Sequence, residues 1–492
     1  MKNKNLKLAQ EKFLKGDKET AKKICLNLIH QKLDTNVFNF LGIIELSENN
    51  YLESLKHFHK SLKLNQNNVK ALNNIGNTLI KKNKYKSAIV FLKKAIAIDN
   101  KFVQAYLNIS LAYLETRDTI NGIAYLKKLL IVDNNNFSAL NNLGSIFHEK
   151  KEYDKSLVYF LRALELNSND EILLNNLGLL YEKQNKFKKA KLHFEKSLNI
   201  KPDFFDCQFN LSLLNLKIGN CKEGMLLYDS RFYRKERKNK LNFDHDVLKL
   251  TLNEINKTKK IYIISEQGYG DIFQFCRVGI VLKKLGYRVA LIIEDSLYEF
   301  FSQQSIFDKY IKKSDIDSDI ITKDIIIPLL SVPRIFELSL KNLNIGNSYI
   351  KPNNEKTEYW SKKIDKNKFN IGISWSTTKD NNYNRNIPIN LFRKINKFKT
   401  TQLISLHTDK HLKDLNENIS DLKDIIFFQN IDIKDKFVDT AAIIENLDLV
   451  ICTDSVVTHL SAAMGKKTWV LLSNYHDWRW SIKTEKSYWY NS

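Results

Sequence analysis

Small and bulky apolar residues recur along the first half of the chain with a period of 34 residues. Small side chains stand in this register at Gly42, Gly76, Ser110, Gly144, Gly178 and Ser212. Twelve positions after each of these, a second small residue follows, at Ser54, Ala88, Gly122, Ser156, Ala190 and Gly224. Four positions later comes a bulky residue, at Phe58, Leu92, Leu126, Phe160, Phe194 and Tyr228. We predict that each unit forms two antiparallel helices, with small side chains where the helices cross and large ones filling the gap.

The repeats resemble the tetratricopeptide repeat (TPR) throughout residues 36–233, and residues 4–33 resemble a degenerate or capping unit. An asparagine recurs in the same register, at Asn74, Asn108, Asn142, Asn176 and Asn210. The resemblance places these residues on the first helix of each pair, which lines the concave groove of TPR arrays. A ladder of amides can pair with the backbone of an extended peptide, and the TPR array of the O-linked N-acetylglucosamine transferases looks like this. The alternative is that asparagine is simply common at this position of the repeat.

The pattern changes after residue 240, where short β-branched runs alternate with helical patterns. The strand-containing runs are 260–265, 287–293, 324–336, 369–375, 400–407, 424–428 and 467–473, and 439–455 combines a helix with a strand. This alternation predicts two Rossmann-like α/β domains that face a cleft, with ligands at the carboxyl ends of the strands. The predicted organisation is therefore a TPR superhelix over 1–240, followed by two Rossmann-like domains over 241–350 and 351–492.

Composition narrows the choice of partners and compartment. The chain of 492 residues has a formal net charge of +23, but its lysines are scattered singly or in pairs. Solvated helix faces explain that distribution better than a nucleic-acid surface does. The five cysteines are widely spaced and contain no C-x-x-C, which indicates a reducing compartment. With neither a signal-peptide pattern nor a run of about 20 apolar residues, we expect a cytoplasmic, soluble protein without a transmembrane segment.

Several segments resemble bacterial TPR-containing glycosyltransferase-family proteins. These segments are "EQGYGD", "IPLLSVPRIF", "DTAAIIENLDLVICTDSVVTHLSAAMGKKTWVLL", "HDWRW" and, after the repeats, "EGMLLYDSRF". The C-terminal half is similar to the ADP-heptose:lipopolysaccharide heptosyltransferases, which have the GT-B fold. This resemblance implies that 241–350 is the acceptor-side domain and that 351–492 is the nucleotide-sugar-binding domain. The resemblance implies transfer of a sugar from a nucleotide-activated donor to a protein or glycan acceptor, with inversion and without a metal or cofactor. The repeats would recruit the acceptor or a peptide partner, and they could also self-associate.

The segment "SEQGYGDIFQFCRV" (265–278) is predicted to be a catalytic loop on the acceptor side. Gly268 and Gly270 allow the backbone to turn at a strand end and approach a ligand. The resemblance implies that Asp271 is the general base that deprotonates the acceptor hydroxyl, and the alternative is that it caps the following helix. Glu266 is a possible second carboxylate that is more often structural, and Gln267 belongs to the same loop.

The segment "CTDSVVTHLSAAMG" (452–465) is predicted to hold the donor diphosphate at a helix N-terminus. Ser455 and Thr458 are small enough to let a phosphate approach. Within this motif we expect His459 to donate to phosphate or sugar, although a lone histidine is more often a packing residue. Asp454 is expected to contact the ribose or to organise the loop.

The segment "GISWSTTKDNNYNRNIPINLF" (372–392) is predicted to form the other wall of the donor site, with Trp375 and Ser376 at the strand end. The resemblance implies that Arg385 bridges the pyrophosphate and stabilises the departing nucleotide. "DSD" at 317–319 has the spacing of the D-x-D pair of metal-dependent transferases, but it lies in a polar stretch and is interpreted as a loop.

Three departures from the family pattern leave a non-catalytic interpretation open. Ser376 stands where the family usually has glycine, "NNYN" precedes Arg385 where an aspartate and a second arginine are usual, and a closing helix after "SYWYNS" is not found. The alternative is a TPR adaptor that binds peptides and carries a relic transferase domain.

Overall fold

The structure is a computed structural model that describes residues 2–31, 33–234, 245–255, 257, 260–316, 325–343, 345–346, 348–377, 385–408, 424–433, 436–473, 476–480, 482 and 485–491. The predicted loop at 317–319, the "NNYN" segment at 381–384 and the boundary at 240–241 lie outside these residues. The chain divides into two compact units, Met1–Ile200 and Lys201–Ser492. Each is described by itself.

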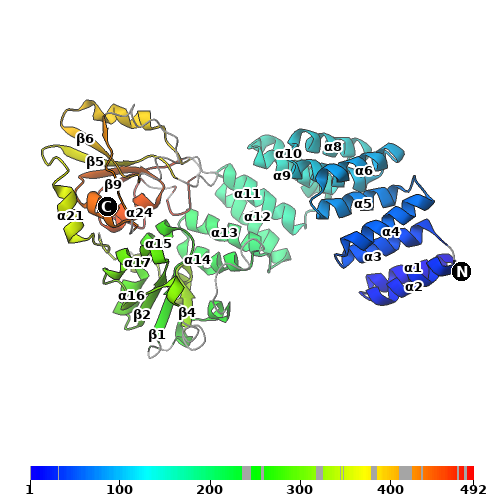
Figure 1. Ribbon diagram of the computed structural model, residues 1–492, viewed down its shortest axis with the longest axis horizontal. Coiled ribbons are helices and arrows are strands. Elements are labelled where there is room, and N and C mark those ends of the chain that lie inside the picture. Colours follow the sequence, from blue (N-terminus) through cyan, green and yellow to red (C-terminus); the bar gives the residue numbers. More distant parts are fainter. Residues whose placement is uncertain are drawn as a thin grey trace. The chain divides into compact units, whose positions relative to one another are not determined.

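The first unit is a stack of helix pairs (Figure 1). Its helices are α1 (Lys2–Leu14), α2 (Lys18–Gln31), α3 (Thr35–Ser47), α4 (Tyr51–Leu64), α5 (Val69–Lys81), α6 (Tyr85–Ile98), α7 (Val103–Glu115), α8 (Thr119–Val132), α9 (Phe137–Glu149), α10 (Tyr153–Leu166), α11 (Glu171–Lys183) and α12 (Phe187–Ile200). Each odd-numbered helix packs on the even-numbered helix that follows it. The α-solenoid predicted from the repeat is confirmed.

Contacts inside the helix pairs explain the spacing of small and large residues. A Cβ atom added at Gly144 would lie 2.4 Å from the Phe160 ring, and one at Gly178 would lie 2.4 Å from the Phe194 ring. The glycines therefore make room for the bulky residues sixteen positions later. Where serine takes one of the two small positions, its hydroxyl donates to a glycine carbonyl of the paired helix, as from Ser156 to Gly144 at 2.7 Å.

The turn within each pair also follows the repeat. A residue with positive φ stands just after every first helix from α3 to α11, at Asn49, Asn83, Arg117, Lys151 and Asn185. This left-handed conformation is a common helix terminator. Since the turn geometry is the same in each unit, the second helix returns at the same angle and the pairs stack regularly.

The second unit begins with the last helix pair of the predicted repeats, α13 (Phe205–Lys217) and α14 (Cys221–Tyr228), followed by the 3-10 helix η1 (Asp229–Phe232). Leu216, Met225 and Tyr228 belong to the same apolar core as Ile261 and Ile263 of the first sheet. The 3-10 helices η3 (His245–Lys249) and η4 (Leu252–Glu254) connect to that sheet.

The first sheet has the order β3-β2-β1-β4, and all its strands are parallel. The strands are β1 (Lys260–Ile264), β2 (Arg288–Ile293), β3 (Lys309–Lys312) and β4 (Ile325–Pro328). The associated helices are α15 (Tyr269–Phe275), α16 (Val278–Lys284), α17 (Asp295–Ser302), η5 (Lys313–Asp315), η6 (Leu329–Ser331), α19 (Val332–Ile335) and α20 (Leu340–Leu343). The sequence did not indicate β3, because this four-residue edge strand reads KYIK. The helical run predicted over 271–286 is two helices that meet at Cys276 and Arg277.

The second sheet has the order β7-β6-β5-β8-β9 and is also parallel. Its strands are β5 (Phe369–Ser374), β6 (Thr401–Ser405), β7 (Ile425–Ile426), β8 (Leu449–Thr453) and β9 (Thr468–Leu471). The helices are α21 (Asn354–Ser361), η7 (Ile389–Lys397), α23 (Val438–Glu445) and α24 (Val456–Ala463). The two parallel sheets with helical crossovers confirm a Rossmann-like module after the solenoid. Among the described residues, no helix is long and apolar enough to span a bilayer.

Candidate active site

The three predicted loops follow β1, β5 and β8, which lie where the strand order reverses in each sheet. Ligands of open α/β sheets bind at such points, beyond the carboxyl ends of the strands. The loop after β1 leads into α15 and the loop after β8 leads into α24, and these two helices pack on each other. The fold thus brings both predicted loops to one place.

Asp271 lies in the first turn of α15 and both of its carboxylate oxygens are engaged. Oδ2 accepts from the backbone N–H of Gly268 at 3.1 Å, so Asp271 supports the helix start from its third position, whereas the N-cap residue is Gly268. Oδ1 accepts from Nη2 of Arg479, in the "HDWRW" segment, and the two side chains form an ion pair. The Asp271 side chain is 12% exposed. Asp271 therefore supports the start of its helix and also faces a cation from the far end of the chain.

The contact between α15 and α24 depends on Gly270. A Cβ atom there would lie 2.8 Å from Cδ2 of His459. The His459 ring is buried, stacks on Trp480 at 5.3 Å between centroids, and its Nδ1 lies 2.9 Å from the Tyr490 hydroxyl. His459 thus fills the junction of the two loops, in keeping with the packing role that a lone histidine commonly has.

We expect Gly270→Ala to destabilise the second unit by about 1–3 kcal/mol, because overpacking at the His459 ring outweighs the helix propensity gained. Gly268→Ala is the matched control, since the nearest atom to an added Cβ there is 3.8 Å away and φ is −90°. Urea unfolding followed by tryptophan fluorescence tests this pair. Equal stability of the two variants would show that α15 and α24 do not pack as described.

The loop after β8 is held by Arg385. Its Nη1 donates to the Asp454 carbonyl at 3.1 Å and lies 3.6 Å from Oδ2 of the same residue. The Thr453 hydroxyl donates to the Arg385 carbonyl. Thr458 is buried and its hydroxyl donates to the Thr453 carbonyl at 2.7 Å, while Ser455 is the N-cap position of α24. Arg385 and Asp454 therefore lie together at the start of α24.

Trp375 and Ser376 follow β5 and are both buried. The Trp375 ring is 1% exposed and belongs to the core beneath the loop. Its backbone N–H donates to Nε2 of His407 at 3.1 Å, and its carbonyl accepts from Ile387 at 2.8 Å. The tryptophan thus positions the loop that carries Arg385, and its ring offers almost no surface to a ligand.

Burial and neighbouring charges set the ionisation of the site. Burial raises the pKa of Asp271, against the lowering effect of the Arg479 charge and the Gly268 N–H. Burial also raises the pKa of Asp454, helped by the negative charge of Asp477 and opposed by Arg385 and Arg479. The pKa of His459 lies well below its ordinary 6.5, because burial and three arginine charges disfavour the imidazolium. His459 is therefore neutral at pH 7.

Glu266 has the structural role that the sequence allowed for it. Its carboxylate forms a bidentate pair with the fully buried Arg231, at 2.7 Å and 3.1 Å, and accepts from the Leu330 N–H at 3.0 Å. Arg231 also bonds to Asp229 at 2.6 Å. Gln267 has φ of 63° and donates to the Tyr228 hydroxyl at 3.2 Å. The loop is thereby fastened to the last helix pair and η1.

Sequence reasoning missed the part played by the C-terminal segment. Arg479 pairs with Asp271 and with Asp477 at 2.7 Å. The buried Arg277 lies between the rings of Tyr349 and Tyr490 and donates to the Trp489 carbonyl at 2.5 Å. The only sequence signal was the match of "HDWRW" to the family pattern, and nothing in it indicated a contact with residue 271. The described C-terminal residues thus return to α15 and α16.

In the solenoid, the predicted asparagines lie on the first helices of the pairs. A cavity of about 390 Å³ is lined by residues of α7, α9 and α11, together with Asp170, and these include Asn108 and Asn142. Several amides pair between neighbouring repeats, from Asn74 to Asn39 at 3.1 Å, from Asn108 to Asn73 at 2.8 Å and from Asn176 to Asn141 at 3.1 Å. Asn142 is exposed, and Asn210, in α13, is partly exposed in the second unit. The ladder therefore links repeats as well as lining a cavity.

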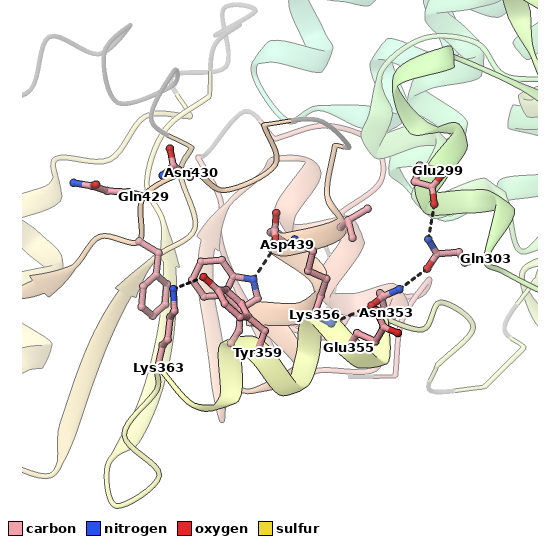
Figure 2. Close-up of a pocket in the computed structure, with 13 residues that line it drawn as sticks. Glu299, Gln303, Asn353, Glu355, Lys356, Tyr359, Lys363, Gln429, Asn430 and Asp439 are labelled. Carbon is pink, nitrogen blue, oxygen red and sulfur yellow. Dashed lines mark hydrogen bonds and ion pairs between the residues drawn. The ribbon is translucent and has the colours of Figure 1, made fainter.

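A larger cavity of about 700 Å³ lies in the second unit, between α17, α21, the segment after β7 and the start of α23 (Figure 2). Beside it, Asp432 and Asp439 are joined by two hydrogen bonds, each from the backbone N–H of one residue to the carboxylate of the other. The Asp439 N–H donates to Asp432 at 2.8 Å, the Asp432 N–H donates to Asp439 at 3.2 Å, and the Thr440 hydroxyl donates to Asp432 at 2.5 Å. Burial raises the pKa of Asp432 from 3.8 to about 6.

This raised pKa predicts a pH-dependent stability. Since the folded state holds the Asp432 proton more tightly than the unfolded chain, its stabilising effect is complete below about pH 4 and is lost as the pH rises to about 6. We expect a loss of about 1–3 kcal/mol over this window. Asp432→Asn keeps a residue suited to φ of 53° and should remove this component. Identical pH profiles of unfolding for the two chains would contradict the prediction.

The fold is that of a TPR solenoid joined to a Rossmann-like module. Comparison with family models agrees with both parts. Tetratricopeptide-repeat models match residues 76–116, 103–136 and 135–203, and glycosyltransferase family 9 (heptosyltransferase) matches residues 329–480. The chain therefore contains tetratricopeptide repeats and a glycosyltransferase family 9 domain. That match includes Arg385, Asp454, His459 and Arg479, whereas Asp271 lies before it.

Several solved structures are similar to part of this chain. One, from a functional characterization of Pseudomonas aeruginosa pilF, is 17% identical and has a TM-score of 0.38, covering 42% of this chain and 95% of its own. TTC0263, a thermophilic TPR protein in Thermus thermophilus, is 20% identical with a TM-score of 0.32, covering 37% of this chain and 100% of its own. YrrB, a TPR protein with an unusual peptide-binding site, is 19% identical with a TM-score of 0.31, covering 37% and 95%. The comparison with curated proteins finds no match.

Proposed function

We propose that this protein transfers a sugar from a nucleoside-diphosphate donor to a hydroxyl of a protein or glycan acceptor, with inversion, through a GT-B-type site. The observation that supports this most is the meeting of Asp271 with Arg479 and of Arg385 with Asp454 at the adjoining starts of α15 and α24. A carboxylate and two guanidinium groups at helix N-termini provide a base and a diphosphate site.

In the proposed reaction, Asp271 accepts the proton of the acceptor hydroxyl as its oxygen attacks the anomeric carbon. The bond from that carbon to the diphosphate oxygen breaks, and the nucleoside diphosphate leaves with the electron pair. Arg385, Arg479 and the first N–H groups of α24 stabilise the negative charge that develops on it. These groups provide that charge stabilisation without a divalent metal, so we propose that the reaction is metal-independent.

The resting contacts imply an order of events. Arg479 is paired with Asp271, and an arriving diphosphate would compete for the same guanidinium. Donor binding would then release Oδ1 of Asp271 for the acceptor. The cavity lined by Asn108 and Asn142 supports a further role for the solenoid, which is to hold a peptide of the acceptor or of a partner protein.

The test is release of nucleotide from donors linked to ADP, UDP, GDP, CMP or dTDP, measured with the full chain in the presence and absence of EDTA. We expect release from one nucleotide class, unchanged by EDTA and reduced at least tenfold by Arg385→Gln. If no donor is consumed under any condition, the transferase proposal fails and the adaptor interpretation takes its place.

A further inference from the structure

The cavity beside α21 has the dimensions and lining of a ligand site, and none of its lining residues takes part in the proposed reaction. Its volume of about 700 Å³ lies within the range of about 300–1,000 Å³ that is usual for small-molecule sites. The end of α17 provides one wall, and α21, the segment after β7 and the start of α23 provide the others (Figure 2). A ligand there would touch both Rossmann-like halves of the unit.

Four of the polar side chains that line this cavity are planar amides. Gln303, Asn353, Gln429 and Asn430 all line it. Asn353 donates to Gln303 at 3.0 Å, and Gln303 donates to Glu299 at 3.0 Å, so these side chains are held in fixed orientations along one wall. Amides offer both donors and acceptors, as sugar hydroxyls do. This lining suits a ligand rich in hydroxyl groups.

The charges of the cavity disfavour an anionic ligand. Lys356 is paired with Asp439 at 3.0 Å, and Lys363 donates to the Tyr359 hydroxyl at 2.6 Å and lies over that ring at 4.2 Å. The remaining charged groups are Glu299 and Glu355. Although the whole chain carries a formal charge of +23, the lining contains three carboxylates and two lysines, and both lysines are already engaged.

Aromatic rings provide an apolar surface in the same cavity. Tyr359 is 49% exposed, whereas Trp360 is buried beneath it and donates its indole N–H to Asp439 at 3.0 Å. Phe428 packs on Trp360 with centroids 4.9 Å apart. The part of the Tyr359 ring that Lys363 does not cover can lie against the C–H face of a sugar ring while the amides bond to its hydroxyls.

We propose that this cavity, formed by α17, α21, the segment after β7 and α23, is a binding site for a short neutral glycan. It adjoins the candidate active site, because Phe437, just before α23, contacts Tyr269 and Phe273 of α15. The inference rests on the proposed function only in assigning the glycan to the acceptor side of a transferase. Binding itself requires neither a nucleotide nor catalysis.

The test is binding of the full chain to an array of di- to tetrasaccharides, neutral ones beside sialylated and sulfated ones, followed by calorimetry with the best binder. We expect a neutral glycan to bind, with at least a tenfold loss of affinity in Tyr359→Ala and in Gln429→Ala. Glu358→Ala is the matched control, since this side chain is 71% exposed, lies next to Tyr359 on α21 and is not part of the lining.

Two further results separate this inference from the proposed function. Asp271→Asn should bind the glycan with unchanged affinity, and the glycan should bind without any nucleotide. Binding only of charged glycans, the absence of any glycan binding, or equal affinity in Gln429→Ala and the unsubstituted chain would overturn the proposal. None of these results would bear on donor consumption, which is measured separately.

Discussion

Replacing Asp271 by asparagine is expected to abolish sugar transfer while leaving the fold and donor binding nearly unchanged. Loss of a general base costs about 10²–10⁴-fold in rate. The amide oxygen can still accept from the Gly268 N–H, so the start of α15 is kept. Arg479 keeps its pair with Asp477. Because a neutral asparagine competes less than a carboxylate with the donor diphosphate for the Arg479 guanidinium, donor affinity should stay the same or rise slightly. Steady-state transfer and calorimetry with the donor measure the two effects.

Asp295→Asn is the matched control for this variant. Asp295 also begins a helix that follows a parallel strand of the same sheet, but it is exposed and bonds to the Ser314 N–H at 3.2 Å. The Asp295→Asn variant should retain full activity. If Asp271→Asn keeps more than a tenth of the activity, Asp271 is not the base. If it loses donor binding instead, the loop after β1 serves the donor and the two loops have been assigned in reverse.

Glu266→Ala is expected to destabilise the second unit by about 3–5 kcal/mol, because it leaves the buried Arg231 charge without its main partner. The Arg231 side chain is 0% exposed and Glu266 is 2% exposed, so solvent does not replace the lost contact. Asp229 still pairs with Arg231, but it also pairs with Arg334. This loss is larger than the one expected for Gly270→Ala.

The tryptophans allow this loss to be measured in the full chain. All six of them lie in the second unit, at Trp360, Trp375, Trp469, Trp478, Trp480 and Trp489. Urea unfolding followed by tryptophan fluorescence therefore reports on that unit and not on the solenoid. Lys362→Ala removes one partner of an ion pair whose side chains are both 71% exposed and should change stability by less than about 1 kcal/mol. A similar small effect of Glu266→Ala would show that the Arg231 pair is not buried as described.

The sequence predicted the elements well where a local pattern determines them. The 34-residue period specified the helix pairs from α3 to α14, because a small residue such as Gly144 must face a bulky one such as Phe160 for two helices to approach. The β-branched runs indicated the parallel strands, apart from the short polar strand β3. The loops after β1 and β8 were also predicted, since a strand followed by glycines or small residues and then a helix is a local signal.

The contacts that assemble the site could not be predicted in the same way. Asp271 and Arg479 are 208 positions apart, and their pairing depends on how α15 packs against α24 and on where the C-terminal segment returns. The pairing of Asn108 with Asn73 depends on the stacking distance of two repeats, which the period alone does not give. The burial of the Trp375 ring likewise follows from packing between β5 and its neighbours.

The most direct test of the central claim is calorimetric titration of the full chain with ADP, UDP, GDP, CMP and dTDP, without metal and at physiological salt. A donor site at Arg385, Arg479 and the start of α24 predicts that one diphosphate binds and that Arg385→Gln weakens it at least tenfold. Failure of every nucleotide to bind, or an equal affinity in Arg385→Gln, would contradict that site.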